Sequence, residues 1–142
     1  MNTRILMIAS ALAMGAAGLA ATFAPLELLG ALKVAPSGPL PVLIQLLGAL
    51  YIGFALANWT AKANVIGGIY SRPLSLANCV HFVAGALALL KYTYATAIGG
   101  ATANAFATPM VVALVIYLGF AACFTYLVFG MGAACQVAPR AK

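Results

Sequence analysis

The sequence predicts an all-α fold, a membrane-embedded antiparallel four-helix bundle. Of its 142 residues, 65% are hydrophobic and only 6% are charged, with a mean hydropathy of +1.11. An ordinary soluble domain carries charge on about a quarter of its residues. The apolar residues also form four long runs, each near the ~20 residues that a helix needs to cross the hydrocarbon core. We therefore expect one transmembrane domain over residues 1–142.

Charged residues and prolines set the limits of the predicted helices. The first apolar run ends before Glu27, and the second ends at Lys62. The third continues past Lys91, whose long side chain can reach the membrane surface. The fourth begins at Pro109, because the missing N–H of proline would be unpaired in the first turn anyway. The predicted helices cover about residues 4–26, 40–62, 73–97 and 109–131.

The first run has a second interpretation, because a basic start, an apolar stretch and small residues also describe a secretory signal peptide. Its apolar stretch of about 20 residues is longer than the roughly 7 to 15 of a signal sequence. We therefore expect it to be retained as a permanent helix.

The distribution of Lys and Arg predicts the orientation, because short cytoplasmic loops are enriched in these residues. Five of them fall on the side that holds both termini and the loop between the second and third runs, and two fall on the other side. The sequence therefore predicts a multi-pass protein of the bacterial inner membrane with both termini in the cytoplasm. A net charge of +6 suits an anionic leaflet and requires no nucleic-acid partner.

Small residues in the second run predict a helix-packing seam. Helices in a bilayer associate by close backbone approach, which small side chains allow. Ala49, Gly53 and Ala57 repeat at intervals of four residues and so share one helix face. We expect this stripe to lie against a neighbouring helix.

Polar side chains within the apolar runs predict a single cluster. Each of them requires a partner or a function in hydrocarbon. Asn58 precedes Lys62 by one turn, while Asn78 and His81 lie within three turns of Arg72 on one face of the third helix. We expect Asn58, Asn78 and His81 to meet, with His81 neutral because burial disfavours its charged form. The cluster is either an interhelical clamp or a ligand site.

Two tyrosines lie deeper in the predicted helices than the others. Tyr51 belongs to the second run and Tyr117 to the fourth. Tyr51 shares a face with Asn58, so it is also a candidate member of the cluster. For both tyrosines we expect packing, with the hydroxyl bonded to a neighbouring helix.

The sequence argues against an enzyme. Glu27 is its one acidic residue, which excludes chemistry that needs paired carboxylates. The three cysteines lack the C-x-x-C spacing of zinc sites, and no C-x-x-C-H is present for covalent haem. We therefore expect no catalytic residues, no metal site and no cofactor.

Short motifs lie along the first two thirds of the chain: Phe23-Ala24-Pro25-Leu26-Glu27, Leu47-Gly48-Ala49, Asn58-Trp59, Gly67-Gly68-Ile69-Tyr70, Arg72-Pro73, Asn78 and His81-Phe82. In these motifs the chain resembles a group of small bacterial four-helix membrane proteins that are distantly similar to the DoxX-like families. The resemblance covers roughly residues 20–90, and the fourth run matches only in being apolar. It implies the four-helix fold and points to the middle hairpin as the region of interest, but it implies no particular reaction.

Three functions compete on this evidence. The first is a small inner-membrane protein that acts by association in the lipid bilayer, as a homo-oligomer or as an accessory subunit of a larger membrane complex. The second is a quinone- or haem-binding protein with its site near His81. The third is an oligomeric transporter or channel, which would need several chains around a pore because one chain offers few polar residues.

Overall fold

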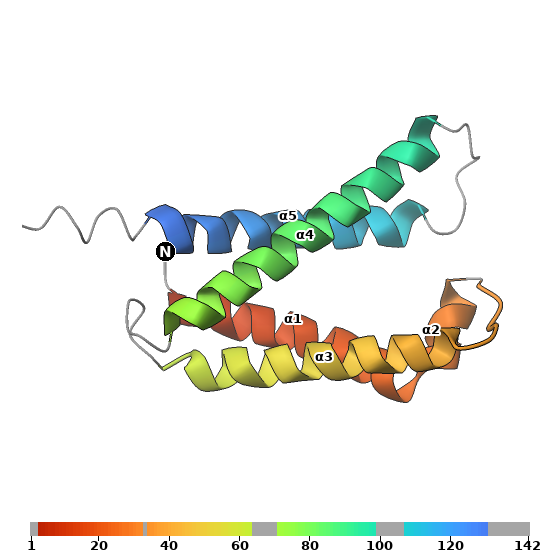
Figure 1. Cartoon of the computed structure of the whole chain (residues 1–142), viewed down its shortest axis with the longest axis horizontal. Coiled ribbons are helices and arrows are strands. Elements are labelled where there is room, and N and C mark those ends of the chain that lie inside the picture. The colour runs from red at the N-terminus through yellow and green to blue at the C-terminus, as the bar shows by residue number, and fades with distance from the viewer. Residues whose placement is uncertain (1–2, 33, 64–70, 99–106, 131–142) are drawn as a thin grey trace, which may run out of the picture. The chain divides into compact units, whose positions relative to one another are not determined.

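The structure is a computed structural model that describes residues 3–32, 34–63, 71–98 and 107–130. These residues are almost entirely helical and include no strand, which confirms the all-α class (Figure 1). The elements in chain order are α1 (Thr3–Phe23), α2 (Pro25–Ala31), α3 (Leu40–Ala61), α4 (Ser71–Ile98), α5 (Ala107–Thr125) and the π-helical turn η1 (Tyr126–Gly130).

Four of the described helices are long and apolar enough to cross a membrane. Their positions agree with the four predicted apolar runs to within a few residues. Prolines lie at or near three of the helix starts, where the missing N–H leaves no hydrogen bond unmade. The four segments are Thr3–Phe23, Leu40–Ala61, Arg72–Ile98 and Thr108–Gly130.

The chain divides into two compact units, Met1–Asn64 and Val65–Lys142. The described part of the first unit contains α1, α2 and α3, and that of the second contains α4, α5 and η1. Each unit is built around one pair of long helices.

The first predicted helix is corrected at its end, because α1 stops at Phe23 rather than continuing to residue 26. Ala24 leaves the helical conformation with φ −129° and ψ 50°. A residue before proline is disfavoured in the α region, and Pro25 then starts the separate short helix α2. Glu27 therefore lies in the first turn of α2, not beyond the end of a longer helix.

The long helices of the first unit, α1 and α3, pack together and run in opposite directions. The contact between Ser10 and Asn58 joins the beginning of α1 to the end of α3. Near the other end, the Gln45 side chain donates a hydrogen bond to the carbonyl oxygen of Thr22 at 3.3 Å. The order of these contacts makes the pair antiparallel, and Figure 1 shows the two helices side by side.

Glycines bring the backbones of α1 and α3 into direct contact. A Cβ atom added at Gly18 would lie 2.9 Å from the carbonyl oxygen of Gly48. A Cβ at Gly48 would lie 2.7 Å from the backbone nitrogen of Thr22 and would also collide with its hydroxyl oxygen. Real Cβ contacts are longer than this, so neither position accepts a side chain without movement of the helices.

The predicted seam is wrong for the α1–α3 contact. Ala49 and Gly53 are exposed, nothing lies within 4 Å of a Cβ built at Gly53, and Ala57 is only half-buried. The buried positions of α3 are instead Gly48, Ala55 and Asn58. Both stripes of α3 contain small residues, but only the Gly48 stripe also carries the buried amide of Asn58, which bonds to α1.

The second unit consists of α4 packed against α5, again antiparallel. Cys79 near the start of α4 contacts Thr125 at the end of α5, and His81 contacts Tyr117 nearer the middle of both helices. The core of this pair contains Phe82 and Phe124, which are 2% and 0% exposed. After Thr125 the helix widens into the π-helical turn η1, where Leu127 remains buried.

The close contact at Gly48 generates the first prediction. Gly48→Ala should lower the free energy of unfolding by about 1–3 kcal/mol, because the added methyl group has no room against Thr22. Gly53→Ala is the matched control on the same helix and should not destabilise the protein, because its Cβ position is open. Unfolding by a denaturing detergent in micelles measures both values. Equal losses for the two variants would contradict this assignment of the seam.

Candidate functional site

The residues predicted to form one polar cluster belong to different units. Tyr51 and Asn58 lie on α3 in the first unit, while Asn78 and His81 lie on α4 in the second. The meeting of Asn58 with Asn78 and His81 therefore stays a prediction. Within each unit, the structure gives these side chains definite neighbours.

Asn58 is bound to α1. Its side-chain nitrogen donates a hydrogen bond to the hydroxyl oxygen of Ser10 at 3.1 Å and lies 3.9 Å from the sulfur of Met14. The Ser10 hydroxyl in turn donates to the carbonyl oxygen of Met7 at 3.0 Å. Asn58 and Ser10 are both 0% exposed. This chain of hydrogen bonds has the geometry of an interhelical clamp inside the first unit.

Thr22 is another polar side chain at the contact between α1 and α3. Its hydroxyl oxygen is buried without a conventional hydrogen-bond partner among the described residues. The same oxygen occupies the space where Gly48 would carry a Cβ atom. It therefore faces the Cα–H of Gly48, an arrangement that recurs as a weak hydrogen bond at helix–helix contacts.

His81 forms the central polar contact of the second unit. The Tyr117 hydroxyl oxygen lies 3.3 Å from Nε2 of His81, and the two ring centroids are 5.6 Å apart. Both side chains are half-buried. The hydroxyl bond expected for Tyr117 is thus confirmed, and its partner is the histidine. For Tyr51, which is half-buried, the expected hydroxyl bond stays a prediction.

Gly85 explains how the Tyr117 ring reaches this position. A Cβ atom at Gly85 would overlap the ring, so the tyrosine fills space that any other residue would occupy. Gly85 lies one turn after His81, and the phenol therefore extends along α4 toward the imidazole. The absence of a side chain at Gly85 therefore allows the contact between Tyr117 and His81.

Two further polar side chains of α4, Asn78 and Cys79, also have partners. The Asn78 side-chain nitrogen donates to the carbonyl oxygen of Leu74, one turn earlier, at 2.9 Å, and Asn78 is 0% exposed. The sulfur of Cys79 lies 3.4 Å from the hydroxyl oxygen of Thr125. The contact of Cys79 with Thr125 is a second polar link between α4 and α5.

Aromatic rings fill the space between these polar contacts. Phe82 stacks on Phe120 and on Phe124, with centroid distances of 4.8 and 5.6 Å. Its edge meets the rings of His81 and Tyr117 at 5.1 and 5.3 Å. Such contacts fix the orientation of each ring, so Phe82 holds the His81–Tyr117 pair against one side of the α4–α5 seam.

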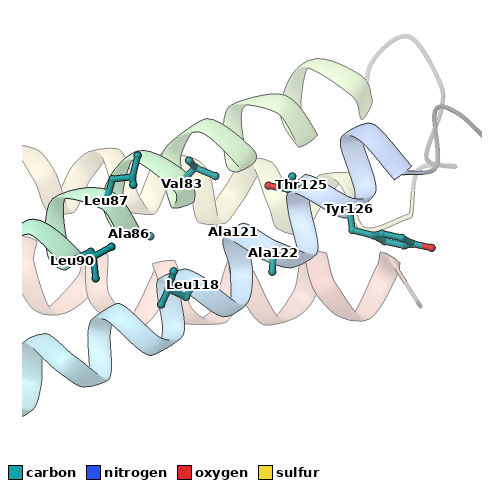
Figure 2. Close-up of a pocket in the computed structure, with 9 residues that line it drawn as sticks. All are labelled: Val83, Ala86, Leu87, Leu90, Leu118, Ala121, Ala122, Thr125 and Tyr126. Carbon is teal, nitrogen blue, oxygen red and sulfur yellow. The ribbon is translucent and has the colours of Figure 1, made fainter.

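A groove of about 520 Å³ lies on the second unit (Figure 2). Almost all of its lining is hydrocarbon, and Figure 2 shows the Tyr126 ring extending away from the other lining residues. The lining consists of Val83, Ala86, Leu87, Leu90, Leu118, Ala121, Ala122, Thr125 and Tyr126.

The groove and the His81–Tyr117 pair occupy opposite flanks of α4. Val83 and Leu90 follow His81 by two and nine residues, which places each of them about 160–180° around the helix from it. Neither His81 nor Tyr117 lines the groove. A ligand held in the groove would therefore not reach the imidazole.

The chemistry available to this arrangement is limited. Within the described ranges, no group of three or more His, Cys, Asp or Glu side chains is placed to hold a metal ion. The contacts described above join hydroxyl, amide, thiol and imidazole groups, which can hold helices together or bind a small polar group. None of them pairs a nucleophile with a base oriented by a carboxylate.

Sequence reasoning identified Asn58, Asn78, His81 and Tyr117 but missed Ser10 and Thr125. A hydroxyl in an apolar helix can satisfy itself by bonding its own backbone, so it gives little signal in the sequence. One signal for Ser10 was available in the sequence. Ser10 shares a face of α1 with Met7 and Met14, and this apolar face is buried.

Comparison with known proteins adds no family to these observations. The chain matches no protein-family model, and neither a curated protein nor a solved structure matches it. The resemblance to the DoxX-like families therefore stays a prediction from short motifs.

The His81–Tyr117 contact generates the second prediction. Tyr117→Phe should lower the free energy of unfolding by about 0.6 kcal/mol, the mean value of an interhelical hydrogen bond in such proteins. Tyr126→Phe is the matched control, because that side chain is 59% exposed. The same detergent unfolding experiment measures both variants. If removing the Tyr126 hydroxyl costs as much as removing that of Tyr117, the contact does not stabilise the helix pair.

Proposed function

We propose that this chain is a multi-pass protein of the bacterial inner membrane that acts by helix association. In this proposal it works as a homo-oligomer or as an accessory subunit of a larger membrane complex. The four long apolar helices support the membrane location. Outside them, the described residues amount to α2 and a few short segments, which offer little surface for chemistry in water.

The observation that carries the proposal is the pairing of polar side chains within each helix pair. Asn58 bonds to Ser10 across the α1–α3 contact, and His81 contacts Tyr117 across the α4–α5 contact. An unpaired polar group in hydrocarbon is costly, so such pairs favour packing over a vacant ligand site. Polar side chains are few in these helices, and the pairs described here join one helix to its neighbour.

The exposed surface of the long helices also supports association. On α3, the side chains of Leu43, Leu46 and Leu50 are 55–64% exposed. On α5, Val112 and Val115 are 53% and 64% exposed. Large apolar surfaces of this kind are typical of contact with lipid or with another membrane protein.

A quinone- or haem-binding function is the second candidate, and one observation favours it. His81 lies nine residues after Arg72, or about 14 Å along α4, close to the middle of a hydrocarbon core about 30 Å thick. Ionisable side chains at such depth often mark functional sites. Against this candidate, the apolar groove lies on the opposite flank of α4.

The third prediction separates these two functions. The tagged chain, purified from its native membranes in a mild detergent, should have a polypeptide mass above the 14.4 kDa of one chain. The excess should correspond to further copies or to a stoichiometric partner, as measured by light scattering and mass spectrometry. A single chain that carries quinone, or a haem absorption band lost in His81→Leu, would support the second candidate and contradict the first.

The fourth prediction concerns orientation. The excess of Lys and Arg, five against two, predicts that both termini lie in the cytoplasm. A reporter enzyme active only in the periplasm should therefore be active when fused after Ala35 or Ala101 and inactive after Ile66 or Lys142. Any other alternation would overturn the proposed topology.

A further inference from the structure

The apolar groove of the second unit lies within two of the candidate membrane spans. Its lining residues all belong to Arg72–Ile98 or to Thr108–Gly130. The buried alanines Ala86 and Ala121 line its floor, whereas the leucines of the lining are 47–62% exposed and form its sides. In a bilayer, a groove at this position opens to hydrocarbon and not to water.

Tyr126 lies at the end of the groove that is nearer to a membrane surface, one turn before its span ends at Gly130. A Cβ atom at Gly130 would lie 2.9 Å from Cδ2 of the Tyr126 ring, so the ring lies against this glycine and is directed toward the end of the span. Figure 2 shows the ring extending away from the other lining residues, and the side chain is 59% exposed. Its hydroxyl therefore lies toward the headgroup level, where tyrosines are enriched in membrane proteins.

The π-helical turn η1 begins at Tyr126. Such turns are rare, occur mostly as single turns, and are frequent at functional sites. The other hydroxyl of the lining, that of Thr125, contacts the sulfur of Cys79 at 3.4 Å. Tyr126 therefore provides the polar group that is directed outward from this lining.

We propose that the groove and Tyr126 bind one phospholipid. An acyl chain lies in the groove, and the Tyr126 hydroxyl donates a hydrogen bond to an ester or phosphate oxygen of the same lipid. This inference rests on the proposed membrane location and adds a ligand class to it. The groove volume of about 520 Å³ is within the range of about 300–1,000 Å³ that is usual for small-molecule sites.

The two features of the site distinguish a lipid from another protein chain. An apolar helix of a second copy could fill the groove, but it would offer no oxygen to a hydroxyl directed toward the headgroup level. A phospholipid supplies both parts, because its acyl chain begins at the ester groups of the headgroup region. The length of the groove and the direction of the Tyr126 ring follow the same order, from hydrocarbon to the end of the span.

The probe for this site is a phosphatidylcholine that carries a photoreactive diazirine midway along one acyl chain. The full chain in a neutral detergent is titrated with this lipid and illuminated, and the labelled peptides are quantified by mass spectrometry. Labelling of residues 83–90 and 118–126 should saturate, and excess unlabelled phosphatidylcholine should compete with it. Labelling of the exposed leucines in residues 43–50 should instead rise in proportion to the probe. Labelling that does not saturate at the groove would overturn the proposal.

A matched pair of variants tests whether the groove is responsible. Ala122→Leu adds a side chain to the lining and should raise the half-saturating probe concentration by about tenfold or more, because the acyl chain loses contact with several methylene groups. Ala88→Leu is the control, because Ala88 is exposed and lies five residues after Val83, or about 140° around α4 from it. It should leave the half-saturation unchanged. Equal shifts in the two variants would overturn the site.

Tyr126→Phe tests the polar part of the site. It should raise the half-saturating concentration by about threefold, as the loss of one hydrogen bond predicts. An unchanged value would overturn the assignment of Tyr126. This variant also provides the comparison with Ala88→Leu if Ala122→Leu does not fold.

Two further measurements identify the occupant and separate this inference from the proposed function. If an unlabelled long-chain isoprenoid alcohol competes at a concentration tenfold lower than phosphatidylcholine does, the groove is an isoprenoid site and the proposal is wrong. If Ala122→Leu reduces the polypeptide mass to one chain and leaves the labelling unchanged, the groove is a contact between copies. Labelling that fails to saturate in a protein with a mass above one chain would refute the lipid site alone. Saturation in a protein with a single-chain mass would refute association alone.

Discussion

Helices of this composition gain little from contacting each other instead of lipid, because lipid tails are as apolar as their own side chains. Their pairing must therefore depend on shape and on polar groups that lipid cannot satisfy. The α1–α3 contact has both features, with glycines that allow backbone contact and the hydrogen bond from Asn58 to Ser10. The packing of the first unit depends on this combination.

The second unit uses the same two features with larger side chains. Gly85 accepts the ring of Tyr117, and the hydroxyl of that ring meets His81. In both units a glycine creates the space, a neighbouring side chain fills it, and a polar pair fixes the partner. Because lipid can offer neither the matching shape nor the hydrogen bond, these contacts select one helix as the neighbour of another.

The sequence predicted the number and places of the long helices because long uncharged runs reflect the thickness of a bilayer. It did not predict the break at Ala24. The apolar run continues through Ala24 to Leu26, so hydropathy alone gave no sign that Pro25 ends α1. It also selected the stripe of Gly53 instead of that of Gly48. Both stripes contain small residues, and the partners on the facing helix, Thr22 at Gly48 and Ser10 at Asn58, distinguish them.

The polar residues were predictable by type and depth, but their partners were less so. The interhelical hydrogen bond of Tyr117 was expected. Asn58 was expected to meet Asn78 and His81, which stays a prediction, and its bond to Ser10 within the first unit was not foreseen. An amide has several donor and acceptor sites, so one observed partner does not exhaust its capacity. The choice among partners depends on helix rotation, which short apolar sequences specify weakly.

The most direct test of this account is a double-mutant cycle on Ser10 and Asn58. The free energy of unfolding in detergent is measured for Ser10→Ala, Asn58→Ala, the double variant and the unchanged chain. The account predicts a favourable coupling energy of about 0.6 kcal/mol or more, because Asn58 donates directly to Ser10 across the α1–α3 contact. Strictly additive losses, with no coupling, would contradict it.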